Sequence, residues 1–221
     1  MSFDPDQDRH DKLIETIHHA ARFIANHIGQ RIDAMADAQT QALADHLAAH
    51  GRVLGIVNNV GLARHETIDA VDPAVFATIM DLNVRPALQL TQALLPGMRA
   101  TRFGRIINIT SLVTRGLAFR FSYAAAKAAL ESITRTMAIE LAGDGITANA
   151  VAPGPTETAL FRANNPHASE GEARYLARVP MQRLAQPSEV AAAIAFLAGE
   201  TAAFITGQTL FVDGGASLGS I

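Results

Sequence analysis

The 221-residue sequence contains no cysteine, which excludes a disulfide framework, a thiolate metal site and a cysteine nucleophile. It has no apolar run of the ~18 residues that a membrane-spanning helix needs. Residues 1–11 are polar and acidic, unlike a signal peptide. It also lacks an excess of positive charge, since its net charge is −3 and its pI about 6.2. We therefore expect a soluble, cytoplasmic protein that binds neither nucleic acid nor membranes.

What the sequence does contain is enough apolar material for a core. Hydrophobic residues make up 49% of the chain and charged residues 18%, which excludes disorder as the main state. The length fits one α/β domain over residues 1–221, because single domains of this class often reach 200–250 residues. Residues 1–10 are polar, and we expect them to be frayed.

Hydrophobic periodicity predicts strands that alternate with helices. Apolar residues three and four apart predict helices at 11–28 and 37–49, and 31–35 is either a short strand or the start of the second helix. Further along, the expected strands are 53–57, 105–109, 147–151 and 209–212, and the expected helices are 73–80 followed by 84–98, 123–141 and 187–197. This alternation is typical of βαβ units and a parallel sheet.

Tyr123 and Lys127 are four residues apart in a predicted helix, so they share a face. A phenol beside an ammonium suits a general acid/base that moves a proton to or from an alcohol or carbonyl oxygen. Two such residues also recur by chance, as an exposed pair on an amphipathic helix. Ser111, residues 58–61 and residues 153–158 follow three predicted strands, at the sheet edge where α/β proteins bind ligands. Taken singly, each of these could be an ordinary turn.

Six motifs occur in order along roughly three quarters of the chain. They are NNVG at 58–61, DLNV at 81–84, RIINITS at 105–111, YAAAK at 123–127, ITANAVAPGPTET at 146–158 and ITGQTLFVDGG at 205–215. In these motifs the chain resembles the short-chain dehydrogenase/reductase family. The resemblance implies a doubly wound, Rossmann-like parallel sheet and a catalytic group of Asn83, Ser111, Tyr123 and Lys127. In it the Tyr is the acid/base, the Ser polarises the substrate oxygen, the Lys lowers the Tyr pKa and holds the nicotinamide ribose, and the Asn positions a relay water.

The same resemblance implies NAD or NADP as cofactor, and no metal. Besides Tyr123 and Lys127, the cofactor-binding residues would be Asn59 and Gly61 on the ribose side, Thr156 and Thr158 on the carboxamide and phosphate side, and Pro153 and Gly154 in the same loop. It further implies a small-molecule substrate under a lid at about 161–181. Small residues around 124–129 would let this helix join subunits into a homodimer or homotetramer.

The sequence departs from the family at its beginning. No Gly-x-x-x-Gly-x-Gly turn, which would hold the cofactor pyrophosphate, occurs in the first sixty residues. The 57 residues before Asn58 are also too few for the missing units, at roughly 30 residues for each βαβ. We expect an N-terminally truncated sheet of four to five strands, with an atypical helical part at 11–51 and a family-like core at 52–221. The strand at 53–57 would then be a sheet edge, covered by helix 11–28 or by a partner.

The function expected from these observations is that of an oxidoreductase interconverting an alcohol and a carbonyl with NAD(P). Two alternatives follow from the absent glycine turn, which should weaken dinucleotide binding. One is a non-redox enzyme that uses Ser111 and Tyr123 for proton transfer. The other is an inactive binding or assembly paralogue.

Overall fold

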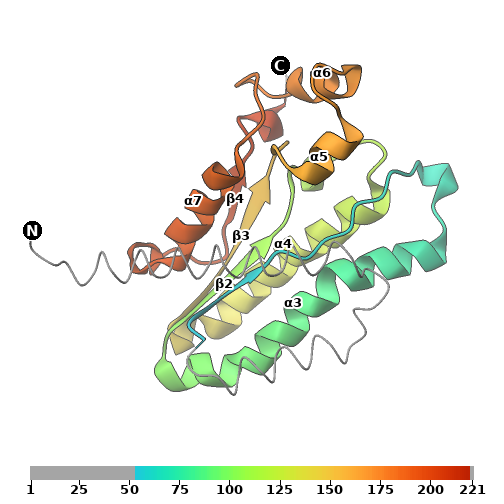
Figure 1. Ribbon diagram of the computed structural model, residues 1–221. Helices are drawn as coiled ribbons and strands as arrows, with labels where there is room; N and C mark the ends of the chain where they lie inside the picture. Colours follow the sequence, from blue (N-terminus) through green and yellow to red (C-terminus); the bar gives the residue numbers. More distant parts are fainter. Residues whose placement is uncertain (1–52, 220–221) are drawn as a thin grey trace, which may run out of the picture.

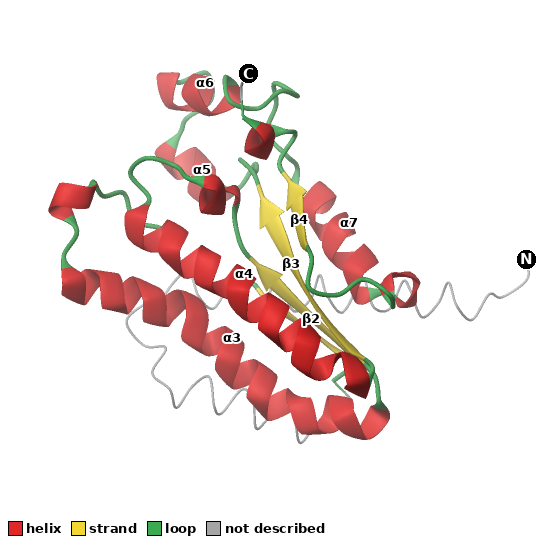
Figure 2. Ribbon diagram, turned by 180° about the vertical axis from the view of Figure 1, so that it is seen from behind, coloured by secondary structure: helices red, strands yellow, loops and turns green. Residues whose placement is uncertain are grey.

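A parallel sheet with helices on both faces forms the centre of the computed structural model, which describes residues 53–219 (Figure 1). Its strand order is β1-β2-β3-β4, and the strands are β1 (Gly55–Asn58), β2 (Gly104–Ile109), β3 (Ile146–Pro153) and β4 (Thr209–Val212). Helices α3 (Pro73–Thr101) and α4 (Phe121–Leu141) lie side by side on one face, and α7 (Pro187–Ala198) covers the other (Figures 1 and 2). The short helices α5 (Ala159–Asn164) and α6 (Glu170–Leu176) lie beyond the carboxyl ends of the strands.

The core has two layers because successive side chains of a strand point to opposite faces of the sheet. Ile106 packs with Leu94 and Met98 under α3 and α4, whereas Ile107 packs with Ile194 under α7. Strands β2 and β3 are buried on both faces, which explains why they are almost continuously apolar.

The predicted alternation of strands and helices is confirmed, with β4 at its expected bounds and the others shifted by a few residues. The predicted break at 81–83 is wrong, because α3 runs unbroken for 29 residues with Pro86 and Pro96 inside it. Each proline removes a helical N–H donor. The helix persists because Asp72 caps its first turn and because Ile79, Leu94 and Met98 are buried against the core.

Strand β1 pairs with β2 and with no other strand of residues 53–219. The predictions for the helices at 11–28 and 37–49, for a strand at 31–35 and for a covered edge concern residues 1–52, outside the described residues. Over the described range, no helix combines the length and the apolar character required to cross a membrane. The four strands agree with the expected Rossmann-like sheet.

Candidate active site at the carboxyl edge of the sheet

Lys127 lies in α4 and reaches the ends of two strands. Its side chain is 3% exposed, and Nζ donates to the carbonyl oxygens of Ile109 (2.9 Å) and Val60 (3.1 Å). Burial lowers the pKa of Lys127 to about 8, because the charged ammonium loses its hydration. Nζ lies 5.7 Å from the centre of the Tyr123 ring. The expected pair therefore faces one space beside the ends of β1 and β2.

Tyr123 is partly exposed one turn before Lys127. Burial raises the pKa of Tyr123, while the Ser111 side chain and the positive charge of Arg120 act in the opposite direction. The pKa rises overall because desolvation of the phenolate outweighs these nearby groups, and the expected lowering by Lys127 stays a prediction. Tyr123 is therefore a neutral phenol at physiological pH, the form that can donate a proton.

Ser111 follows β2 and begins the short 3-10 helix η3 (Leu112–Arg115), where its Oγ accepts from the Val113 N–H (3.4 Å). Its side chain interacts with the Tyr123 hydroxyl. Thr110 is instead buried, and its hydroxyl donates to Val151 O (3.2 Å). This supports Ser111, rather than its neighbour, as the hydroxyl of the site.

Asn83 projects from α3 into the same space. It is 1% exposed, and its Nδ2 donates to Ile79 O (2.8 Å) and Leu62 O (3.2 Å), whereas Oδ1 has no hydrogen-bond partner among residues 53–219. A Cβ on Gly61 would lie 3.0 Å from both Asn83 Oδ1 and Lys127 Nζ. The glycine therefore lets the Asn83 acceptor and the Lys127 cation pack closely against the backbone after β1. These groups suit the hydroxyls of a nicotinamide ribose, so the residues present fit that half of NAD(P).

The other predicted cofactor residues lie at the end of β3 or on the loop after it, except Asn59, which is exposed after β1. Gly154 has a packing reason to be glycine, since a Cβ there would lie 2.7 Å from Asp213 Cα. The Thr156 hydroxyl donates to Gly154 O (2.9 Å). The Thr158 hydroxyl caps α5 by accepting from Phe161 N–H (3.1 Å). These two hydroxyls thus already serve the loop, and Pro153 is the last residue of β3.

A buried polar chain below the site was not anticipated from the sequence. Asn58 Nδ2 donates to Asn108 Oδ1 (2.8 Å), and Asn108 Nδ2 donates to the Thr134 hydroxyl (2.8 Å), which joins β1, β2 and α4. The sequence signal for this chain was Asn108 inside an otherwise apolar strand, because a buried amide requires hydrogen-bond partners.

Glu66 was also missed. It is 7% exposed, its Oε1 accepts from the Ser122 N–H (2.9 Å), and its own N–H donates to Phe119 O (3.1 Å). Glu66 therefore holds the first turn of α4, and with it Tyr123, against the loop after β1. A single acid in a loop gives no sequence signal for such a contact.

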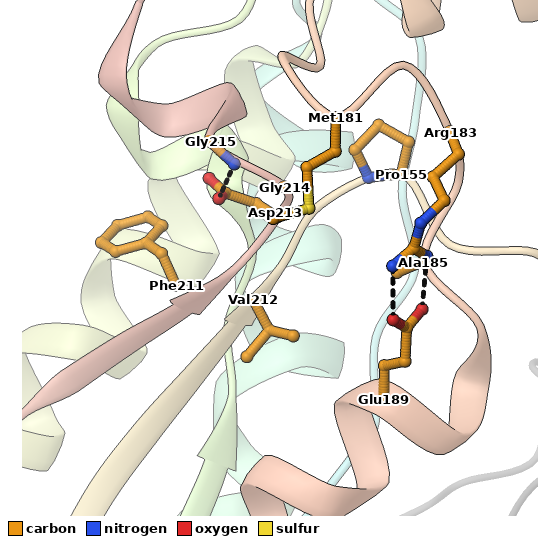
Figure 3. Close-up of a pocket in the computed structure, with 10 residues that line it drawn as sticks. All are labelled: Pro155, Met181, Arg183, Ala185, Glu189, Phe211, Val212, Asp213, Gly214 and Gly215. Atoms are coloured by element: carbon orange, nitrogen blue, oxygen red, sulfur yellow. Dashed lines mark hydrogen bonds and ion pairs between the residues drawn. The ribbon is translucent and has the colours of Figure 1, made fainter.

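A cavity of about 380 Å³ lies between the end of β4 and α7 (Figure 3). Arg183 and Glu189 form two hydrogen bonds across it (2.7 and 2.6 Å), and Asp213 accepts from Gly215 N–H (2.9 Å). None of Asn83, Ser111, Tyr123 and Lys127 lines this cavity. The expected chemistry is therefore not located there.

Comparisons with known proteins agree with this geometry. Residues 6–217 match the family model described as enoyl-(acyl carrier protein) reductase. The 3-oxoacyl-(acyl-carrier-protein) reductase FabG of Vibrio cholerae is 42% identical over 180 residues, which are 81% of this chain and 71% of that protein. The acetoacetyl-CoA reductase of Allochromatium vinosum is 38% identical over 161 residues, covering 72% and 64%.

Solved structures of the same kind are similar as well. A gluconate 5-dehydrogenase from Burkholderia cenocepacia, in complex with NADP and tartrate, has a TM-score of 0.76 at 36% identity, over 83% of this chain and 72% of that one. A short-chain dehydrogenase/reductase family protein has a TM-score of 0.71 at 39% identity, over 80% and 72%. The chain belongs to the short-chain dehydrogenase/reductase family of NAD(P)-dependent oxidoreductases.

Proposed function

We propose that this protein interconverts a carbonyl compound and the corresponding alcohol at the space between Ser111, Tyr123, Asn83 and Lys127. The observation that carries the proposal is the convergence beside Gly61 of Asn83 Oδ1 and the Lys127 ammonium, one turn from the Tyr123 phenol. Groups that would hold a hydride carrier thus lie next to a proton donor, the combination that carbonyl reduction requires.

NAD or NADP, when bound, supplies or accepts the hydride at the substrate carbon. The chain's own residues handle the oxygen and the proton. The Ser111 hydroxyl holds the substrate oxygen, and the Tyr123 phenol gives it a proton during reduction and removes one during oxidation. Lys127 and Asn83 hold the ribose side, and the loop at 153–158 borders the remainder. Because the Tyr123 pKa is raised, the protonated, reduction-competent form predominates at neutral pH.

Carbonyl-dependent oxidation of NADPH or NADH, followed with purified full chain, tests this proposal. Tyr123→Phe should lower kcat by about 100-fold or more, because general acid catalysis contributes on that order, and should leave cofactor affinity in calorimetry within about twofold. Tyr175→Phe is the matched control, since it makes the same change at the other tyrosine of the chain. An unchanged kcat in Tyr123→Phe would refute the assignment. Proton-transfer activity without cofactor consumption would indicate the non-redox alternative.

The relatives point to a narrower substrate class. Their names refer to 3-oxoacyl, acetoacetyl or gluconate substrates, all of which have a carboxyl-derived group on the reacting chain. We propose that the small-molecule substrate here is likewise a ketone or secondary alcohol with such a group.

Homodimer or homotetramer formation by one domain spanning 1–221 is part of the same proposal, as is a cytoplasmic location. Family membership supports the oligomer, and light scattering on the purified chain tests it. A monomer at micromolar concentration would contradict it.

A further inference from the structure

Arg120 lies immediately before α4 and three residues before Tyr123. Its guanidinium is partly buried, with Nη2 donating to Tyr175 Oη (3.2 Å) and Nη1 donating to Arg64 O (3.4 Å). Both acceptors are neutral, although a guanidinium binds a carboxylate more strongly through two parallel hydrogen bonds. The cation therefore has partners that fix its position without neutralising its charge.

Three acids of the surrounding elements are already engaged elsewhere. Glu66 accepts from Ser122 N–H and lies 3.8 Å from Arg64 Nε. Glu157 and Glu172 both pair with Arg162, across the segment that contains α5 and α6. Within residues 53–219, no carboxylate forms an ion pair with Arg120. The positive charge of Arg120, next to the proposed acid/base Tyr123, therefore has no counter-charge among residues 53–219.

Two pairs of aromatic rings include a neighbour of this guanidinium, namely its acceptor Tyr175 and the preceding residue Phe119. The Tyr175 ring meets Phe161 edge-on at 5.3 Å, and Phe119, the neighbour of Arg120, stacks on His65 at 4.7 Å. Because Arg120 is partly buried, an ion pair formed there would be stronger than one in bulk water. The charge of Arg120 also reaches Tyr123, since it counteracts the rise in the pKa of that phenol. An anion bound to Arg120 would thus lie close to the reacting oxygen.

We propose that Arg120 binds a free carboxylate of the substrate, so that oxo acids and hydroxy acids are the substrate class rather than thioesters or esters. This inference rests on the proposed function and narrows it. In reduction, hydride from NAD(P)H adds to the ketone carbon and the proton from Tyr123 adds to its oxygen. The products are the hydroxy acid and NAD(P)⁺, and the carboxylate bound to Arg120 is unchanged.

Acid and ester pairs with the same carbon skeleton test this inference directly. The pairs are pyruvate with ethyl pyruvate, acetoacetate with ethyl acetoacetate, and levulinate with ethyl levulinate. The measured quantity is the ratio of kcat/KM for the acid to kcat/KM for the ester. We expect the unmodified protein to prefer the acid in at least one pair. Arg120→Met should lower that ratio about tenfold or more, and Arg120→Lys should lower it less because a cation remains.

Two control variants separate charge recognition from loss of structure. Arg135→Met removes an exposed arginine from α4, the helix that Arg120 precedes, and should leave the ratio within about twofold. Tyr175→Phe removes the phenol that accepts from Arg120 but keeps the cation, so the acid preference should persist. Loss of the preference in Tyr175→Phe would show that the position of the α6 segment, not the charge of Arg120, determines it, and would overturn the inference.

A direct binding measurement distinguishes failure of this inference from failure of the proposed function. Calorimetric titration with L-tartrate and with acetoacetate should give binding that Arg120→Met abolishes, even if no compound is reduced. Ester preference in every pair, an unchanged ratio in Arg120→Met, or the absence of carboxylate binding would each refute the role of Arg120. Reduction of esters alone would leave the oxidoreductase function standing.

Discussion

The buried ammonium of Lys127 should titrate far below an ordinary lysine, and this is the sharpest physical prediction from the site. Its pKa of about 8 compares with 10.5 for a solvated lysine, because the residue is 3% exposed and the ammonium has two carbonyl acceptors within the part of the chain that the structure describes. The sequence makes the measurement clean, since Lys12 and Lys127 are its two lysines. NMR of selectively labelled lysine side chains should therefore give two titrations, one near the ordinary value and one near 8.

The lowered pKa of Lys127 also predicts that the stability of the fold depends on pH. Below pH 8 Lys127 is protonated in both the folded and the unfolded chain, and between 8 and 10.5 the unfolded chain binds the extra proton. Stability contributed by this group therefore rises with pH across that interval. The difference from 10.5 to about 8 corresponds to roughly 3 kcal/mol, an upper value for one fully buried group.

Denaturant unfolding of the unmodified chain and of Lys127→Met, at several pH values from 7 to 10.5, tests this magnitude. The free energy of unfolding of the unmodified chain should gain on that of the variant by up to roughly 3 kcal/mol as pH rises. Groups that titrate in both proteins contribute equally to the two free energies of unfolding, so their contributions cancel in the difference. A constant difference, or a Lys127 pKa near 10.5 by NMR, would refute the argument that desolvation dominates at this site.

Two substitutions of glycine test the close packing around the site. Gly154→Ala should lower the free energy of unfolding by about 1–3 kcal/mol, because the new Cβ would meet backbone at 2.7 Å; Gly143→Ala, with nothing within 4 Å, should have little effect in the same denaturant assay. Equal effects would contradict the packing reason for Gly154. Gly61→Ala should weaken NADPH binding about tenfold or more in calorimetry, because the methyl group would lie 3.0 Å from Asn83 Oδ1 and from Lys127 Nζ and would displace both groups. Unchanged affinity would mean that the cofactor does not contact these two groups.

Much of the fold was predictable because its strands are short apolar runs bounded by turns. The predicted bounds were wrong where tertiary contacts extend an element. Strand β3, for example, continues to Pro153, and the next residue, Gly154, donates its N–H to Val212 O (3.0 Å). The break predicted in α3 came from the polar residues at 81–83. Asn83 is buried inside the helix, where its Nδ2 donates to Ile79 O and Leu62 O, so its polarity does not mark a helix end. Helices α5 and α6 were missed, although Thr158 and Ser169 cap their first turns.

The centre of the site followed from topology, since the carboxyl ends of parallel strands converge on one edge. Ser111, Tyr123 and Lys127 were identified in this way, together with the family resemblance. Glu66 and Arg120 were not, because they join loops to α4 and α6 over more than fifty residues of sequence. Periodicity carries no information about such contacts, which exist only after the chain has folded.

The amide pair Asn58–Asn108 also constrains how the sheet can align. The two residues are register partners of β1 and β2, and β1 has four residues. A slip of two residues would keep the same side chains on each face, so hydrophobic alternation alone does not prevent it. Such a slip would leave buried amides unpaired and move Gly61 by about 6–7 Å along the strand direction. Correct alignment of one short strand is therefore also a condition for assembling the proposed catalytic residues.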